Sequence, residues 1–380
     1  MISTKKVKID PLNPQEEYIK EAAGILAAGG LVIIPTETVY GIAANALNPK
    51  AIEKLYKIKE RPKDKPFSLH IAGREKIEEF ACDIPIFAYK LMSKIWPGPL
   101  TLILRAKTGG VIDALTSFSV NGERGRTIGI RVPDNEVALR IIKLSGVPVV
   151  CPSANISGKP APVNFTDAIK DLDGLVDFAI DSGATKLQVE SSVVDCAESS
   201  LRVLREAAIK KEVLEAVARR KTVLFVCTGN SCRSVMAEAL LKKKLKERNR
   251  GDVEVLSAGV MMMAGLGATE ATKEILKKEG IDVSSHRSRM VTKELLRKSD
   301  IILVMEKLHE ERILQVAADV QNRLFLLKEF VNPVRNLVFG GVKKDADNLD
   351  IIDPIANSME FYAETCRIIK QAVERVSDII

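Results

Sequence analysis

The chain has 380 residues, of which 46% are hydrophobic and 28% are charged, and its formal net charge is +7. This length exceeds one ordinary core and predicts two domains, while the composition excludes a disordered or low-complexity chain. The lack of a long apolar run or an apolar leader predicts a cytoplasmic protein with no membrane partner.

The six cysteines contain no Cys-x-x-Cys pair, which argues against a zinc ribbon or a disulfide framework. The modest positive charge suits anionic substrates or weak RNA contact, although a solvated basic surface would give the same value.

In chain order, the first half alternates amphipathic stretches with short apolar runs. This pattern predicts an α/β domain with a mixed sheet over residues 1–209. The predicted helices are 14–28, 49–59, 84–95 and 135–144, and the predicted strands are 31–35, 67–72, 100–106, 127–132, 147–151, 178–181, 191–196 and 201–205.

Hydroxyl and basic side chains follow several of these strands. The run PTET at 35–38 provides hydroxyls for the polar head of a small substrate, and KIKERPKDK at 57–65 is strongly basic, although such runs are usually solvated surface. No Walker loop is present, so side-chain cations, aided by Mg²⁺, would have to neutralise a nucleotide triphosphate. Further candidate groups lie in TIGIRVP, CPSANISGK, ESSVVD and LRVLRE.

The second half begins after a predicted linking helix at 210–221. Regular alternation over 222–380 predicts a doubly wound parallel sheet with its ligand at the carboxyl end of the first strand, and 334–348 is predicted to be an exposed loop. The predicted strands are 222–227, 253–257, 300–305 and 323–327, and the predicted helices are 234–248, 268–279, 307–316 and 358–378.

The segment VLFVCTGNSCRS predicts a phosphate cradle. Cys227 ends an apolar strand, and Arg233 follows at the start of a helix, where inward N–H groups and the helix dipole favour an anion. Arg233 can bind two phosphoryl oxygens, and the same field favours the thiolate form of Cys227. A buried structural cysteine is the commoner alternative, but it does not explain the loop. The predicted loop residues are Thr228, Gly229, Asn230, Ser231, Cys232 and Ser234.

A leaving group must be protonated, and Asp353 in the Asp353-Pro354 pair is the candidate acid, although such a pair is also a common turn. Ser234 is interpreted as a donor to the thiolate or as a helix cap. Ser257 and His286 are interpreted as supports for Asn230 or as satisfied structural groups.

Residues 222–380 resemble the low molecular weight protein tyrosine phosphatase family through VLFVCTGNSCRS, LSAGV, GIDVSSHRSR, ILVM and DP. The resemblance implies a metal-free reaction in two steps. Cys227 attacks the phosphoryl group held by Arg233, and Asp353 protonates the leaving group and then activates water.

Two residues depart from the usual family pattern. Val235 replaces a proline, and Ile355 replaces an aromatic residue that stacks on phosphotyrosine. Ser231 is similar to a threonine that accepts from the substrate guanidinium in the arginine phosphatase branch, so phosphoarginine is favoured over phosphotyrosine as the group on the phosphoprotein substrate.

Residues 8–209 resemble the YrdC family of threonylcarbamoyl-AMP synthases through PTETVYG, KIKER, WPGPLT, IRVP, SAN and SSVVD. The resemblance implies that L-threonine, bicarbonate and ATP with Mg²⁺ give threonylcarbamoyl-AMP and pyrophosphate, for the t6A modification of tRNA. Enzymes of tRNA modification or RNA are then expected partners. LREAAI replaces the usual LRPGAI, which puts Glu206 beside Arg205. By similarity, threonine faces Thr36, His70, Arg131 and Ser191, and ATP faces Lys59, Arg61, Lys65, Thr127, Ser153, Asn155 and Arg205.

Alternatives from other classes remain open at this point. The first half could bind double-stranded RNA without catalysis, or hydrolyse nucleotides without threonine. The second half could be a catalytically weak redox sensor that pairs Cys227 with Cys232.

Overall fold

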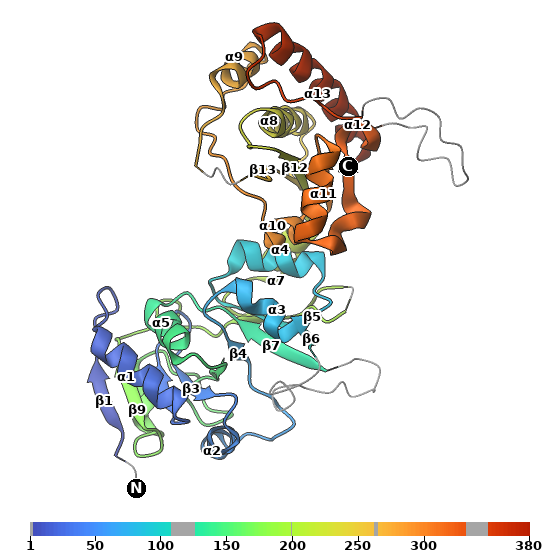
Figure 1. The fold of residues 1–380 in the computed structure, drawn as a ribbon. Helices are drawn as coiled ribbons and strands as arrows, with labels where there is room; N and C mark the ends of the chain where they lie inside the picture. Colours follow the sequence, from blue (N-terminus) through green and yellow to red (C-terminus); the bar gives the residue numbers. More distant parts are fainter. Residues whose placement is uncertain (1–2, 108–125, 199, 262–264, 332–348) are drawn as a thin grey trace. The chain divides into compact units, whose positions relative to one another are not determined.

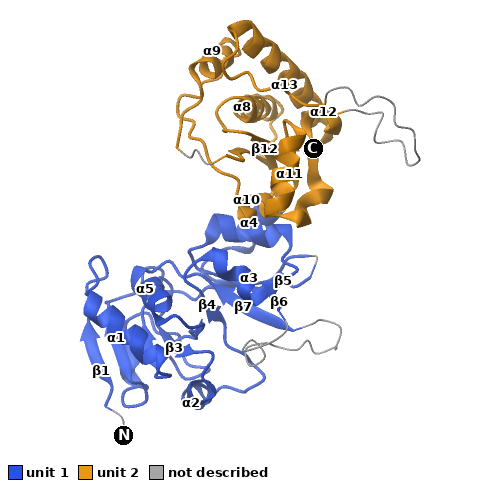
Figure 2. Ribbon diagram, in the orientation of Figure 1, with its two compact units in different colours: residues 1–218 blue, residues 219–380 orange. Residues whose placement is uncertain are grey.

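The computed structural model describes residues 3–107, 126–198, 200–261, 265–331 and 349–380, so the predicted loop at 334–348 lies outside the described residues. The chain divides into two compact units, Met1–Ala218 and Arg219–Ile380 (Figures 1 and 2). Within the described ranges, no helix combines the length and apolar character needed to cross a bilayer.

The first unit is built on an 11-stranded mixed sheet. The strand order is β1-β9-β2-β3-β8-β4-β7-β6-β10-β11, and β5 pairs with β6. Parallel pairs such as β6 with β10 occur beside antiparallel pairs such as β6 with β7, which confirms the predicted mixed α/β fold. The strands are β1 (Lys5–Lys8), β2 (Val32–Ile34), β3 (Gly41–Asn45), β4 (Leu69–His70), β5 (Ala81–Cys82), β6 (Leu100–Ala106), β7 (Thr127–Arg131), β8 (Val149–Val150), β9 (Phe178–Asp181), β10 (Ser192–Asp195) and β11 (Arg202–Arg205).

Three helices of the first unit begin at asparagine caps. The side chains of Asn48, Asn135 and Asn164 accept backbone N–H groups at the starts of α2, α5 and α6. The predicted linking region contains α7, whose Leu214 is buried in the core of the first unit. The helices are α1 (Glu16–Ala27), α2 (Pro49–Lys59), η1 (Arg74–Lys76), α3 (Ile77–Phe80), α4 (Ile86–Ile95), α5 (Glu136–Ser145), α6 (Phe165–Lys170) and α7 (Lys211–Arg219).

The second unit contains a four-stranded sheet in the order β13-β12-β14-β15, and all of its neighbouring pairs are parallel. The predicted parallel sheet is therefore confirmed, whereas α10 and α12 were not predicted. The strands are β12 (Lys221–Cys227), β13 (Val253–Gly259), β14 (Ile301–Val304) and β15 (Leu324–Leu326). The helices are α8 (Arg233–Glu247), α9 (Glu270–Lys278), α10 (Lys293–Lys298), α11 (Lys307–Val316), η3 (Ala318–Arg323), α12 (Leu327–Phe330) and α13 (Met359–Ile379).

The central strand β12 has a core on each face. Val223 and Phe225 pack with residues of α8 and α13, whereas Leu224 and Val226 pack with residues of α10 and η3. This period of two is that of a strand buried between helical layers. Cys227 therefore lies at the carboxyl end of a strand that is covered on both sides.

Candidate active sites

The first unit contains a pocket of about 490 Å³ at one edge of its sheet. β4 and β7 are parallel and end there at His70 and Arg131, and β10 begins there after Ser191. These ends meet because β6 is antiparallel to β7 and parallel to β10. The predicted ligand-binding residues that line the pocket are Thr36, Arg61, Lys65, His70, Arg131, Ser153, Ser191 and Arg205.

Arg131 is held in this pocket by buried polar groups of the PTET run. Its Nη2 atom lies 2.8 Å from Glu37 Oε1 and donates a hydrogen bond to Thr38 Oγ1 at 2.9 Å. Thr36 Oγ1 donates to the carbonyl of Val39 at 2.7 Å, so the 2.9 Å contact between the two threonine hydroxyls has Thr38 as donor. The run is thus a connected chain of donors that begins at Arg131.

His70 is a neutral group of the pocket at physiological pH. Burial, and next the charge of Arg131, lower the pKa of His70 to about 3, with the backbone of Ser68 as a weaker opposing influence. Among the described residues, His70 Nδ1 has no hydrogen-bond partner of normal geometry. The ring therefore lines the pocket without adding charge.

The other cations of the pocket are already oriented. Arg61 donates from Nε to the carbonyl of Lys65 at 2.8 Å, and its guanidinium lies 5.3 Å from the centre of the Phe67 ring. Arg205 donates from Nε to the carbonyl of Ser191 at 2.9 Å, and its Nη1 lies 2.5 Å from Glu190 Oε1. Such preorganised donors suit a polyanionic ligand.

Three predicted residues are absent from the lining of this pocket. Lys59 is buried behind it, where Nζ donates to the carbonyls of Ser153 and Asn155 at 2.6 and 2.7 Å. Burial, and next the charge of Arg61, lower the pKa of Lys59 to about 8. Asn155 Oδ1 accepts from Ser153 Oγ at 2.6 Å. Thr127 lies at the opposite end of β7 from Arg131.

Several lining residues were not singled out from the sequence, namely Tyr40, Asp64, Ser68, Thr101, Cys151 and Glu190. They lie on or beside strands that become neighbours only in the folded sheet. Their types are ordinary, so no local pattern separates them from structural residues.

In the second unit, a serine hydroxyl at the start of α8 lies beside the sulfur of Cys227. Cys227 Sγ lies 3.0 Å from Ser234 Oγ. Because Asn230 Nδ2 donates to that same serine oxygen at 3.0 Å, the serine proton is free to point at the sulfur. Asn230 has a positive φ of 53°, which an asparagine tolerates at a sharp turn.

Asn230 is supported from several sides. Its Nδ2 donates to Ser257 Oγ at 2.8 Å, and its carbonyl accepts from His286 Nε2 at 2.8 Å. Ser257 in turn donates to the largely buried carboxylate of Glu238. Gly259 lets the loop approach β13, since a Cβ there would meet the carbonyl oxygen of Thr228 at 2.7 Å.

Arg233 is fully buried and contacts two carboxylates, those of Glu306 and Asp353. Its Nη1 also donates to the carbonyl of Ile351 at 2.7 Å, and its Nη2 donates to Thr228 Oγ1 at 3.1 Å. The predicted nucleophile loop, arginine and acid are thus brought into one connected cluster.

Glu306 and His309 belong to this cluster and were missed. His309 Nδ1 accepts the backbone N–H of Glu306 at 3.2 Å, so Nε2 carries the proton and donates to Thr228 Oγ1 at 2.9 Å. Burial, and next the charge of Arg233, lower the pKa of His309 to about 4. Both residues follow β14, the neighbour of β12, and the rule that ligands bind at carboxyl ends of parallel strands would have found them.

Of the remaining loop residues, Cys232 contacts Thr269 and Tyr362. Cys232 Sγ lies 3.3 Å from Thr269 Oγ1 and 3.7 Å from both Ser231 Oγ and Tyr362 Oη. A Cβ at Gly229 would meet only Ser231 Oγ, at 3.6 Å. Cys227 and Cys232 are both free thiols.

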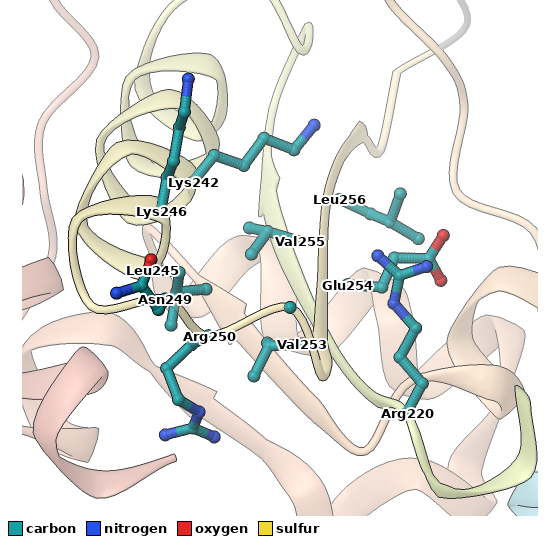
Figure 3. Close-up of a pocket in the computed structure, with 11 residues that line it drawn as sticks. Arg220, Lys242, Leu245, Lys246, Asn249, Arg250, Val253, Glu254, Val255 and Leu256 are labelled. Carbon is teal, nitrogen blue, oxygen red and sulfur yellow. The ribbon is translucent and has the colours of Figure 1, made fainter. Parts of the chain in front are cut away.

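A separate groove of about 580 Å³ lies in the second unit (Figure 3). Lys242 and Lys246 extend from α8 on one side of it, and Arg220 extends from the segment before β12 on the other. Residues Val253–Leu256 of β13 line the groove. Val253 pairs with Lys221, which lies at the opposite end of β12 from Cys227. The groove therefore belongs to the amino ends of the strands.

Residues 24–207 match the family described as Telomere recombination, which comprises Sua5, YciO and YrdC, and residues 222–378 match the family described as Low molecular weight phosphotyrosine protein phosphatase. The first part is 42% identical over 208 residues to a threonylcarbamoyl-AMP synthase of Bacillus subtilis, which covers 55% of this chain. The alignment spans only 58% of the length of that relative.

Two further similarities cover more of the proteins compared. A crystal structure of Pyrococcus abyssi Sua5 complexed with L-threonine is 31% identical, with a TM-score of 0.51, over 68% of this chain and 85% of that chain. A probable low molecular weight protein-tyrosine-phosphatase of Ralstonia nicotianae is 31% identical over 154 residues, which are 40% of this chain and 92% of that protein.

Proposed function

Since residues 24–207 belong to the Sua5, YciO and YrdC family and residues 222–378 belong to the low molecular weight phosphotyrosine protein phosphatase family, we propose that the chain is a bifunctional enzyme. The first unit makes threonylcarbamoyl-AMP from L-threonine, bicarbonate and ATP, and the second hydrolyses phosphoproteins. The first activity is supported most directly by the pocket, because Arg131 and His70 line it together with Arg61 and Arg205.

In the proposed synthase reaction, Arg131 binds the carboxylate of threonine and neutral His70 and Ser191 orient the rest of the amino acid. The threonine amine adds to carbon dioxide derived from bicarbonate, and a carbamate oxygen then attacks the α-phosphorus of ATP with loss of pyrophosphate. Arg61, Lys65 and Arg205 neutralise the phosphates, so positioning and charge balance supply most of the catalysis.

Magnesium fits this pocket as a partner of the nucleotide. The lining offers two carboxylates, Asp64 and Glu190, and Arg205 already contacts Glu190. The described residues hold no cluster of three or more metal-binding side chains. The ion would therefore be held mainly by the phosphates, with Asp64 as the available protein ligand, and would supply charge neutralisation.

The test is pyrophosphate release from ATP by the intact chain, with and without threonine and bicarbonate. The proposal requires release that depends on both. A protein that only binds double-stranded RNA gives none, and a simple nucleotide hydrolase gives release without threonine.

For the second unit, the contact between Cys227 and Ser234 beside Arg233 supports attack by sulfur on a bound phosphoryl group. The sulfur forms a bond to phosphorus as the bond to the leaving atom breaks, and Asp353 gives that atom a proton. Asp353 then takes a proton from the water that hydrolyses the cysteinyl phosphate. Thr228 Oγ1 already accepts from Arg233 and His309, so its own proton is free for a phosphoryl oxygen.

Phosphoarginine is the substrate that this site favours. Glu306 already balances the charge of Arg233, and His309 is neutral, so the negative charge of a bound phosphoryl group is compensated better by a guanidinium leaving group than by a phenol. Ile355, half exposed, offers no ring to stack on phosphotyrosine. Hydrolysis of matched phosphoarginine and phosphotyrosine peptides tests this, and faster turnover of phosphotyrosine contradicts it. Loss of all hydrolysis in Cys227→Ser distinguishes an enzyme from a redox sensor.

A further inference from the structure

Arg131 and Glu37 form a buried ion pair beside the pocket of the first unit. Arg131 lines the pocket, whereas Glu37 does not, and their side chains are only 5% and 2% exposed. A single buried charge is strongly unfavourable, so the negative charge of Glu37 is needed to keep a guanidinium at this position. No assigned role in threonine or ATP binding uses Glu37.

The contacts of the pair leave hydrogen-bonding capacity for a ligand. Arg131 Nη2 is occupied by Glu37 and Thr38, but Arg131 Nε has no hydrogen-bond partner anywhere in the described ranges. Nor does either oxygen of Glu37 make a well-aligned hydrogen bond to a described group, so the carboxylate acts on Arg131 mainly through its charge. The free N–H belongs to the partner that faces the pocket.

Glu37 is anchored independently of any ligand. Its backbone carbonyl accepts from the N–H of Leu187 at 2.8 Å, and the carbonyl of Thr38 accepts from Thr185 Oγ1 at 2.8 Å. The segment is therefore tied to the loop that contains Thr185 and Leu187. A carboxylate fixed in this way sets both the orientation and the charge balance of the guanidinium.

We propose that Glu37 is a positioning residue that cancels the charge of Arg131, holds its guanidinium in place for a substrate carboxylate, and thereby makes the pocket select a zwitterionic amino acid over an anion. This inference rests on the proposed synthase function. Arg131 and Glu37 together carry no net charge, and His70 is neutral. A zwitterion adds no net charge to this buried region, whereas a carboxylate without an ammonium group adds one.

The test uses the full chain, with pyrophosphate release as the readout and 3-hydroxybutyrate, an amine-free anionic analogue of threonine, as a competitive inhibitor. In Glu37→Gln, one negative charge is lost while the shape is kept. The inhibition constant of the anion should then fall roughly tenfold relative to the KM for threonine, because the region becomes positive. Glu190→Gln is the matched control: it removes a carboxylate that pairs with Arg205 rather than Arg131 and is 43% exposed, so solvent screens the lost charge and the ratio should change by less than about twofold.

Glu37→Asp separates position from charge. It keeps the charge but shortens the side chain, so the KM for threonine should rise several-fold while the KM for ATP and the inhibitor ratio stay near their wild-type values. The KM for ATP, which belongs to the same unit as Glu37, reports whether that unit is folded. An unchanged ratio in Glu37→Gln, or an unchanged KM for threonine in Glu37→Asp, overturns the inference. Absence of threonine-dependent release in the wild type overturns the proposed function instead.

Discussion

The most informative single perturbation of the phosphatase site is Ser234→Ala. Its hydroxyl lies 3.0 Å from Cys227 Sγ, and the donation from Asn230 directs the serine proton to the sulfur. A hydrogen bond to a charged group contributes about 1.5–3 kcal/mol, and each 1.36 kcal/mol is tenfold in rate, so kcat should fall about 10- to 150-fold. The assay is steady-state hydrolysis of an aryl phosphate by the intact chain.

Ser231→Ala is the matched control for this prediction. It removes a hydroxyl from the same loop, but that hydroxyl contacts Cys232 Sγ at 3.7 Å. Its aryl phosphatase rate should stay within about threefold of wild type, since the contact is weak. Thermal unfolding of each variant verifies that the second unit is folded. A Ser234→Ala rate equal to that of Ser231→Ala would refute the assignment of the serine proton to the sulfur.

Three further predictions concern stability and pH. Gly41→Ala should destabilise the first unit by roughly 1–3 kcal/mol in thermal unfolding, because the added Cβ would lie 2.3 Å from Cys151 Sγ. Gly24→Ala is the control: a Cβ at this position in α1 meets open space, so the substitution should be neutral or stabilising. The KM for ATP should rise above about pH 8 as Lys59 loses its proton, and Lys59→Arg should flatten this rise. Between about pH 6.5 and 4, His309 binds a proton in the unfolded chain but not in the folded unit. The free energy of unfolding measured in urea should therefore fall by on the order of 2 kcal/mol from pH 7 to 5. The fall should be smaller in His309→Gln.

The features that were predictable are those encoded in contiguous sequence. Cys227, Asn230 and Ser234 fall within one strand, loop and helix start, so their spacing alone predicts a cradle. The parallel sheet of the second unit was likewise predicted, because each strand is an apolar run followed by an amphipathic helix. Strand β1 was missed because KKVK carries no apolar run and is formed by pairing with β9 at the sheet edge.

The features that were not predictable depend on which strands become neighbours. Glu306 reaches Arg233 only because β14 lies beside β12. Glu37 stands in a run whose hydroxyls were noted, but its ion pair with Arg131 requires the end of β7 to meet the PTET run. Lys59 belonged to a predicted nucleotide-binding motif, yet its ammonium is buried among backbone carbonyls.

The central claim is that one chain carries two separate active sites, and a paired assay of two single variants tests it most directly. Pyrophosphate release from ATP and threonine, and phosphate release from a phosphoarginine peptide, are measured on wild type, Arg131→Ala and Cys227→Ser. We expect Arg131→Ala to lose only the first activity and Cys227→Ser only the second. The claim would be contradicted if either variant lost both activities. It would also be contradicted if Arg131→Ala kept pyrophosphate release or Cys227→Ser kept phosphate release.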